Sequence, residues 1–360
     1  MKVLIVHPVM GFLGGGERLC CETVRALLAG GHEITMLSGA FSMRRVEQFF
    51  GYEGLFDRVN LLLYPPANGP QILGSTTHII QHLRGQRQRL KQLGELRHPP
   101  FDLQFSTQDP GYIPSIRLPI IQWGYFPKTF PMYPTNSILK VVRTWPLRTH
   151  YRRQVSRIGM VLAISKFSKA YLDMEWKHPS VLVYPACNMV DSGQKRDLVV
   201  TVARAIPEKR LELFWKLARQ RPQYEFLMLI TQDQRFRKYA IDLSQQAPEN
   251  GKTVLDAPKE TYQEILGEAR VYIHLMEREH FGITIVEAMS ASCVPIVHDS
   301  GGPQEIVEDG TGFRWRNIDD VPKMIDEAMK MSPSAAAKHR AQDFNTKKFG
   351  EKLSSLFSGQ

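Results

Sequence analysis

Cysteine is scarce in this sequence of 360 residues. Its four cysteines, Cys20, Cys21, Cys187 and Cys293, form no C-x-x-C pair and have no histidine at the spacing of a metal site. This pattern excludes a disulfide-rich scaffold and a small zinc module. We expect reduced thiols in a cytoplasmic protein.

Long hydrophobic runs are also missing. No apolar stretch approaches the roughly 20 residues that a helix needs to span a bilayer. Residues 3–6 are too few for the apolar part of a signal peptide, so we interpret them as a first buried strand. The length is sufficient for two domains, each with its own core.

Acidic residues are absent from residues 110–172. The net charge of +10 equals the number of basic residues in this segment: Arg117, Lys128, Lys140, Arg143, Arg148, Arg152, Arg153, Arg157, Lys166 and Lys169. Aromatic residues lie among them, including Trp123, Tyr125, Phe126, Phe130, Tyr133, Trp145 and Tyr151. Cations mixed with amphipathic rings favour contact with an anionic membrane surface.

A second basic run covers residues 84–97. The spacing predicts a helix with Arg84, Arg87 and Lys91 on one side. A solvated helix face explains this run equally well. A basic face is also compatible with nucleic-acid binding, which would be strongly salt-dependent.

The first 40 residues predict a strand, a glycine-rich turn, a helix to about residue 29 and a second strand at residues 34–37. The dinucleotide fingerprint is incomplete, because Leu19 stands where the third glycine is needed and no acid follows the second strand. A nicotinamide oxidoreductase is therefore disfavoured. Gly14, Gly15 and Gly16 allow the backbone to approach a ligand closely, and a purely structural turn is the alternative.

The most informative stretch is residues 279–287, EHFGITIVE. Glu279 lies in a predicted loop, Phe281 and Gly282 form a sharp turn, and apolar spacing predicts a helix from Ile283. The start of a helix suits a phosphate or a sugar hydroxyl, and carboxylates accept hydrogen bonds from vicinal hydroxyls. Glu287, one turn into the helix, would border the same cleft. Charges on a surface helix are the alternative.

These residues resemble the two-glutamate motif of the retaining glycosyltransferases of family 4. The seven-residue spacing, the inner Phe-Gly and the glycines of residues 300–303 match that motif. The resemblance implies an α/β GT-B fold, with two Rossmann-like domains facing each other across a cleft and a C-terminal helix crossing back. We expect an acceptor-binding domain at residues 1–187 with 343–360, and a nucleotide-sugar-binding domain at 188–342.

The resemblance also assigns roles. Glu279 would contact the donor sugar and Glu287 the ribose, with Phe281, Gly282 and Ile283 beside the donor. Arg204 and Lys209 would hold the diphosphate, and Gly14, Gly15 and Gly16 would lie beside the donor phosphate and the acceptor. Cations at the diphosphate favour the transition state, because negative charge grows there as the glycosidic bond breaks. Glu279, Arg204 and Lys209 are thus the predicted catalytic residues.

Asp109 and Tyr125 are the predicted acceptor-side residues. Both follow expected strands, at the edge where open α/β sheets bind ligands. Many relatives have a histidine where this chain has Tyr125. A tyrosine can donate a hydrogen bond but cannot shuttle a proton near neutral pH.

The predicted activity is metal-independent transfer of a hexose with retained configuration. The chain has no D-x-D pair to chelate a metal on a nucleotide diphosphate, so we expect no cofactor. Likeness to lipid-linked oligosaccharide mannosyltransferases implies GDP-mannose as donor, a lipid-linked acceptor and peripheral attachment at the cytoplasmic membrane face, without nucleic acid. The alternatives are a non-catalytic scaffold at a membrane and a UDP-sugar enzyme with a soluble acceptor.

Overall fold

The structure, a computed structural model, describes residues 1–65, 76–92, 100–126 and 138–357. The chain divides into two compact units. Unit 1 comprises Met1–Val183 with Gly350–Gln360, and unit 2 comprises Tyr184–Phe349. Tyr184 and Cys187 group with unit 2 because the Tyr184 ring packs against Phe344 and Cys187 pairs with Asn345.

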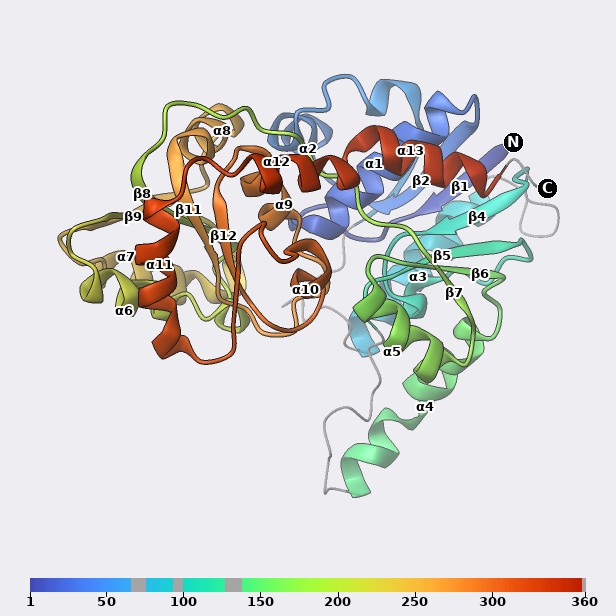
Figure 1. Cartoon of the computed structure of the whole chain (residues 1–360). Coiled ribbons are helices and arrows are strands. Elements are labelled where there is room, and N and C mark those ends of the chain that lie inside the picture. Colours follow the sequence, from blue (N-terminus) through green and yellow to red (C-terminus); the bar gives the residue numbers. More distant parts are fainter. Residues whose placement is uncertain (66–75, 93–99, 127–137, 358–360) are drawn as a thin grey trace. The chain divides into compact units, whose positions relative to one another are not determined.

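Unit 1 contains a parallel sheet of seven strands (Figure 1). Its strands are β1 (Lys2–Val6), β2 (Glu33–Gly39), β3 (Asn60–Tyr64), β4 (Leu103–Ser106), β5 (Ile120–Gly124), β6 (Met160–Ala163) and β7 (Ser180–Leu182). Their order is β3-β2-β1-β4-β5-β6-β7. The inner strands β1, β4 and β5 are almost entirely buried, as the apolar runs predict.

Helices connect these strands: α1 (Gly15–Ala29), α2 (Met43–Phe50), α3 (Thr76–Gln92), α4 (Ile138–Val155) and α5 (Lys166–Trp176). The predicted basic helix at residues 84–97 is α3, which begins earlier and ends at Gln92 before residues outside the described part. Arg84, Arg87 and Lys91 are exposed on it, as predicted. The last helix, α13 (Thr346–Ser355), ends in residues that group with unit 1, where the Phe357 ring contacts His32.

Unit 2 contains a parallel sheet of six strands. They are β8 (Arg196–Arg204), β9 (Glu225–Thr231), β10 (Gly251–Leu255), β11 (Ala269–His274), β12 (Val294–His298) and β13 (Phe313–Trp315), in the order β10-β9-β8-β11-β12-β13. Its helices are α6 (Glu212–Gln220), α7 (Arg237–Gln245), α8 (Lys259–Glu268), α9 (Ile283–Ser290), α10 (Pro303–Ile306), α11 (Val321–Lys330) and α12 (Ala335–Ala341). The predicted α/β class with two parallel-sheet domains is confirmed.

Each sheet has one point where the chain reverses the direction in which it adds strands. In unit 1 this switch point lies between β1 and β4, and in unit 2 between β8 and β11. Open α/β sheets bind ligands at the carboxyl ends of the strands that flank the switch point. The residues that follow these four strands are therefore the first to consider as a site.

The basic segment differs in part from the expectation. Trp123 and Tyr151 belong to the core of unit 1, because strand β5 and the inner face of α4 pack there with large side chains. The Trp123 indole donates a hydrogen bond to Thr23. Trp145 is 66% exposed. Lys128, Phe130 and Tyr133 lie outside the described residues. No helix in the described part of the chain is both long and apolar enough to cross a bilayer.

A chain of four buried side chains anchors α3 in unit 1. The Tyr64 hydroxyl lies 2.9 Å from Nδ1 of His82, the two Nε2 atoms of His82 and His78 are 3.2 Å apart, and Nδ1 of His78 lies 2.8 Å from the Tyr112 hydroxyl. One proton must lie between the two Nε2 atoms, so only one histidine nitrogen donates there. A further proton would place two N–H groups against each other.

We expect this pair to make unit 1 acid-sensitive. Burial lowers the pKa of both histidines, and His78 helps to lower the pKa of His82 to about 4. The unfolded chain therefore binds more protons than the folded chain below about pH 6.5, so stability is lost as the pH falls from there toward 4. The expected loss between pH 7 and 5 is on the order of 1 kcal/mol.

Thermal denaturation at both pH values measures this loss. His82→Gln removes one titrating group, so its stability should depend less on pH than that of the wild type. His178→Gln, at a partly exposed histidine outside this chain of side chains, is the matched control and should keep the full dependence. An unchanged pH dependence in His82→Gln would contradict the assignment.

Candidate functional site

The carboxyl end of β8 places two predicted cations next to the switch point of unit 2. Arg204 is the last residue of β8, and Lys209 ends a 3₁₀ turn, η3 (Pro207–Lys209). Pro207 begins the turn with a preset backbone angle, which suits its first position. Arg204 is half-buried, and among the described residues its guanidinium has no hydrogen-bond or ion-pair partner. It therefore offers a cation with free donors.

Glu279 lies at the end of the adjacent strand, in the loop after β11. One carboxylate oxygen accepts a hydrogen bond from the backbone N–H of His280 at 3.0 Å. The other forms an ion pair with Lys209 and lies 3.2 Å from Nε2 of His274. The Glu279 and Lys209 side chains are only 14% and 19% exposed, which strengthens their attraction relative to a surface pair.

The pKa values of this cluster follow from these contacts. Burial raises the pKa of Glu279, but Lys209 and then His274 outweigh it, so the pKa lies well below its usual value. Burial lowers the pKa of His274. Glu279 raises this pKa and Lys209 lowers it, and the net result is a lowered pKa. Near neutral pH the cluster therefore contains an ionised carboxylate and a neutral histidine that donates its Nε2–H.

The Phe281–Ile283 segment turns the chain into α9 as predicted. Gly282 adopts φ of +113°, which L side chains rarely adopt, and a Cβ there would lie 2.5 Å from Ile285. The first backbone N–H groups of α9 have no acceptor within the helix. The Ile285 N–H donates to the Gly282 carbonyl at 3.0 Å, so the backbone donors left at the start of α9 are those of Ile283 and Thr284, a few residues after Glu279 in the chain.

Glu287 lies one turn into α9 and is almost fully buried. Its carboxylate accepts a hydrogen bond from the Tyr262 hydroxyl on α8. The structure therefore places Glu287 next to an aromatic hydroxyl that orients it. Its predicted contact with a ribose stays a prediction.

The remaining predicted residues belong to unit 1. Gly14 precedes α1, and Gly15 and Gly16 form its first turn. The Tyr125 hydroxyl donates to the Thr107 carbonyl at 2.9 Å and lies 3.4 Å from the Gly16 carbonyl. Asp109 caps the short 3₁₀ turn η2 (Pro110–Tyr112) by accepting from the Gly111 N–H. The side chains of Tyr125 and Asp109 thus have structural contacts in addition to any role toward the acceptor.

Two polar neighbours of the predicted site escaped the sequence reasoning. His274 is the last residue of β11, a strand of mostly buried residues in which a polar role is not expected. Its position five residues before Glu279 is the only sequence feature that points to it. Tyr262 lies on a separate helix and carries no local signal. Lys209 and Glu279 are brought into direct contact, whereas Arg204 is brought to the same switch point without a direct bond to either.

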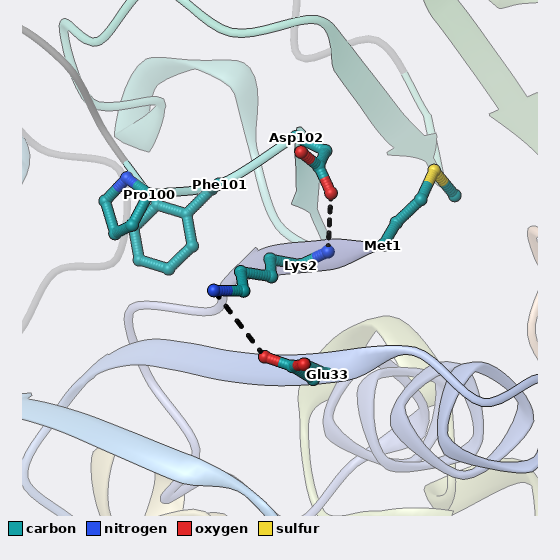
Figure 2. A pocket seen from close by; sticks show the side chains of 6 residues that line it. All are labelled: Met1, Lys2, Glu33, Pro100, Phe101 and Asp102. Atoms are coloured by element: carbon teal, nitrogen blue, oxygen red, sulfur yellow. Dashed lines mark hydrogen bonds and ion pairs between the residues drawn. The ribbon is translucent and has the colours of Figure 1, made fainter.

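An open pocket in unit 1 lies elsewhere. It is lined by Met1, Lys2, Glu33, Pro100, Phe101 and Asp102, at the amino ends of the first strands (Figure 2). The Lys2 backbone N–H is bonded to Asp102 at 2.7 Å. Amino ends of parallel strands are not where such sheets bind ligands, so this pocket is not a candidate substrate site.

Comparison with known proteins bears on the family and the fold. A model of the family described as "Glycosyl transferases group 1" matches residues 190–343. A GDP-Man:Man(3)GlcNAc(2)-PP-Dol alpha-1,2-mannosyltransferase of Yarrowia lipolytica is 26% identical over 49% of this chain and 33% of its own length. The human protein of that name is 28% identical over 48% of this chain and 42% of its own. The chain thus spans less than half the length of these relatives.

A further relative covers more of the chain. The alpha-1,3/1,6-mannosyltransferase alg2 of Schizosaccharomyces pombe is 22% identical over 86% of this chain and 69% of its own length. Among solved structures, Anabaena HepE in complex with UDP and glucose has a TM-score of 0.75 at 15% identity, with both chains fully covered. Sucrose-phosphate synthase from Thermosynechococcus elongatus has a TM-score of 0.77 at 15% identity, covering 100% and 99%. The chain therefore has the GT-B fold, and its residues 190–343 match the model of the group 1 glycosyl transferases.

Proposed function

We propose that this protein transfers mannose from GDP-mannose to a lipid-linked oligosaccharide, with retained configuration and without a metal. The activities for which these relatives are named support mannose, GDP and a dolichol-linked acceptor. The single observation that carries catalysis is the cluster of Lys209, Glu279 and His274 at the switch point of unit 2. A non-catalytic scaffold would not need a buried, ionised carboxylate paired with a lysine at a ligand-binding edge.

The chemistry assigned to these residues follows from their charges. The bond between the anomeric carbon and the diphosphate oxygen breaks, and its electron pair stays on the diphosphate. Arg204 and Lys209 neutralise that charge, which lowers the barrier because the charge is larger in the transition state. Glu279 accepts hydrogen bonds from sugar hydroxyls. The acceptor hydroxyl oxygen bonds to the anomeric carbon on the face that the diphosphate leaves, and the diphosphate takes the proton of that hydroxyl.

Location belongs to the proposal as well. We place the protein at the cytoplasmic membrane face, attached peripherally. Arg117, Arg152, Arg153 and Lys166 are exposed in unit 1, and each basic residue near anionic lipid contributes about 1 kcal/mol. Sedimentation with phosphatidylserine vesicles, compared with neutral vesicles, tests this attachment.

A screen of nucleotides tests the donor. GDP or GDP-mannose at about 100 times its dissociation constant should stabilise the fold by roughly 2.7 kcal/mol in a thermal-shift assay. A selective response to UDP would instead favour the alternative of a UDP-sugar enzyme, which the UDP complexes of HepE support. No response to any nucleotide would overturn the proposal.

Transfer itself is measured with labelled GDP-mannose and a polyprenyl diphosphate-linked oligosaccharide. The expected product has the α-configuration of the donor, which NMR of the anomeric proton reads directly. Transfer should persist in EDTA. An inverted product or complete loss in EDTA would contradict the stereochemistry or the metal independence, respectively.

A further inference from the structure

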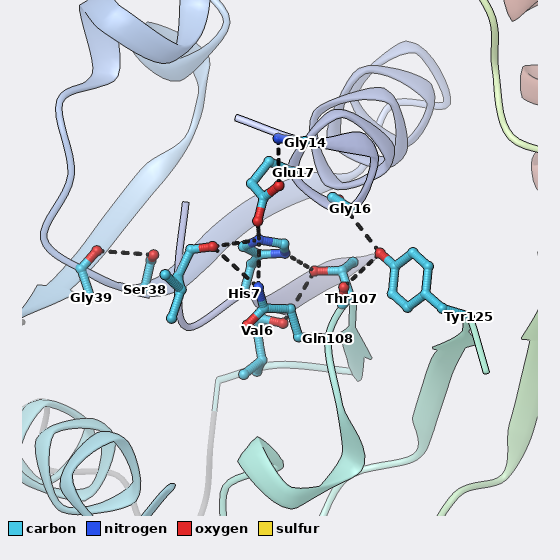
Figure 3. A network of polar contacts seen from close by, with 11 residues as sticks. Val6, His7, Gly14, Gly16, Glu17, Ser38, Gly39, Thr107, Gln108 and Tyr125 are labelled. Carbon is cyan, nitrogen blue, oxygen red and sulfur yellow. Dashed lines mark hydrogen bonds and ion pairs between the residues drawn. The ribbon is translucent and has the colours of Figure 1, made fainter. Parts of the chain in front are cut away.

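A second polar network lies at the switch point of the sheet in unit 1 (Figure 3). His7 follows β1 and is fully buried, and Thr107 and Gln108 follow β4. Glu17, in the first turn of α1, contacts the same imidazole. None of these residues belongs to the donor site of unit 2, yet they occupy the position where such sheets bind ligands.

The hydrogen bonds of His7 determine its protonation. Nδ1 lies 2.8 Å from the Thr107 hydroxyl, which donates its own proton to the Val6 carbonyl at 3.2 Å. That hydroxyl must therefore accept from Nδ1. Nε2 lies 3.0 Å from the Val9 carbonyl, which can only accept. Nε2 also lies 3.2 Å from the Gln108 amide nitrogen, but that amide donates its proton to the Val9 carbonyl at 3.1 Å. The Val9 carbonyl and the Glu17 carboxylate, 3.8 Å away, both favour a proton on Nε2, so the contacts favour a ring with both nitrogens protonated.

The charge of this ring has a counter-ion. Oε1 of Glu17 lies 3.8 Å from Nε2 of His7, and its other oxygen accepts from the Gly14 N–H at 2.8 Å. Burial would lower the pKa of His7, but the Cys20 thiol and Glu17, both on α1, raise it to about 10. The only other polar side chains facing the ring are Thr107 and the Gln108 amide, among the described residues.

The network holds the glycine-rich turn that precedes α1. His7 and Gln108 both contact the Val9 carbonyl, at 3.0 and 3.1 Å, where the turn begins. Glu17 holds Gly14, where the turn ends. Between them Leu13 adopts φ of +50°, a left-handed conformation that is strained for a residue with a side chain. Such strain persists where neighbouring contacts determine the backbone, and it is concentrated at functional sites.

We propose that His7 is a positioning residue: a buried imidazolium, neutralised by Glu17, that holds residues 9–16 in the shape that receives the substrate in unit 1. The identity of that substrate rests on the proposed function. The charge of the His7 ring and its contacts with the turn do not depend on the proposed function, and they are measured separately.

The first test is nitrogen NMR of the wild-type protein labelled at histidine. At pH 7 both ring nitrogens of His7 should show the chemical shifts of protonated nitrogens, and the ring should not titrate below pH 8. His7→Gln identifies the signal. One unprotonated ring nitrogen at pH 7 would overturn the proposal.

The second test is kinetic. His7→Gln can still donate to Val9 but loses the charge and the bond to Thr107, and Glu17→Gln removes the counter-charge. Because a misplaced substrate loses up to about 100-fold in rate, both variants should lower kcat/KM for the acceptor by about tenfold or more. Nucleotide affinity should fall by less than kcat/KM for the acceptor, because the variants leave Arg204, Lys209 and Glu279, the predicted donor contacts of unit 2, in place. His178→Gln is the matched control.

Outcomes separate this proposal from the proposed function. Folded variants with kcat/KM within twofold of the wild type would overturn the positioning role, while transfer by the wild type would still stand. If no donor supports transfer, amide hydrogen exchange at residues 9–16 replaces kinetics. Exchange there should be about tenfold faster in both variants, and unchanged exchange would overturn the role. If His7→Gln does not fold, the kinetics or hydrogen exchange of Glu17→Gln tests the positioning role, and the wild-type nitrogen spectrum tests the charge of the ring.

Discussion

Lys209→Met should lower kcat for sugar transfer by about 10²–10³-fold, with Glu279→Gln producing a loss of similar size. Removing one preorganised group that stabilises developing charge typically has an effect of that order. In the proposed mechanism Lys209 would supply the charge at the diphosphate, and Glu279, its ion-pair partner, would orient that lysine and accept from the sugar. Steady-state kinetics with saturating donor and acceptor measures the loss.

The same loop offers matched controls. Arg210 directly follows Lys209, and Glu277 lies two residues before Glu279. They form an ion pair of their own, with side chains 34% and 51% exposed. Arg210→Met and Glu277→Gln should leave kcat within about twofold, because an exposed pair is screened by water. Equal losses in the two pairs would show that the loop, and not the buried charges, carries the effect.

A stability measurement completes this test. Removing one member of a largely buried pair leaves the other charge without its partner, so each single variant should be less stable than the wild type. The double variant, Lys209→Met with Glu279→Gln, removes both charges and should recover part of that loss. A double variant less stable than either single would contradict the pairing.

Gly302→Ala should disrupt the donor site without touching a charge. A Cβ on Gly302 would lie 2.5 Å from the Cα of Phe281 and 2.7 Å from the carbonyl oxygens of His280 and Phe281. These are backbone atoms, so the EHFG loop itself must move. Overpacking of this kind costs about 1–3 kcal/mol. We expect that loss in thermal denaturation, with nucleotide affinity at least tenfold weaker by calorimetry.

Gly350→Ala is the control for this substitution. Gly350 lies in α13, and a Cβ there would meet nothing within 4 Å. Alanine also favours a helix over glycine, by roughly 1 kcal/mol, so stability should rise slightly or stay unchanged. If Gly302→Ala matched Gly350→Ala in both measurements, the close packing of the loop would have no functional weight.

Much of the local structure was predictable because it depends on neighbours in sequence. The helix after residue 282 follows from its apolar spacing, and Ser165 caps α5 as its side-chain chemistry predicts. The two strands predicted at residues 3–6 and 34–37 are β1 and β2, which extend one or two residues further at their ends. Strand ends are set by pairing with neighbouring strands, which a single segment does not contain.

The site was predictable only in part. Glu279 and Lys209 were assigned from a motif, but their ion pair depends on β8 and β11 lying side by side although 70 positions separate the two residues. His274 and Tyr262 were missed for the same reason. In the basic segment, residues 110–172, the sequence led to a wrong expectation. Trp123 and Tyr151 were expected to face a membrane surface, but they are buried in the fold.

The sequence indicated the two-domain architecture through its resemblance to a known family. It determined the turn at Gly282 and the residue types of the site by itself, because periodicity and backbone stereochemistry act over a few residues. Tertiary structure decided which charges meet: Lys209 with Glu279 in unit 2, and His7 with Glu17 in unit 1. Protonation and orientation depend on burial and on partners from distant strands, and parallel strand order brings those partners together only after the chain has folded.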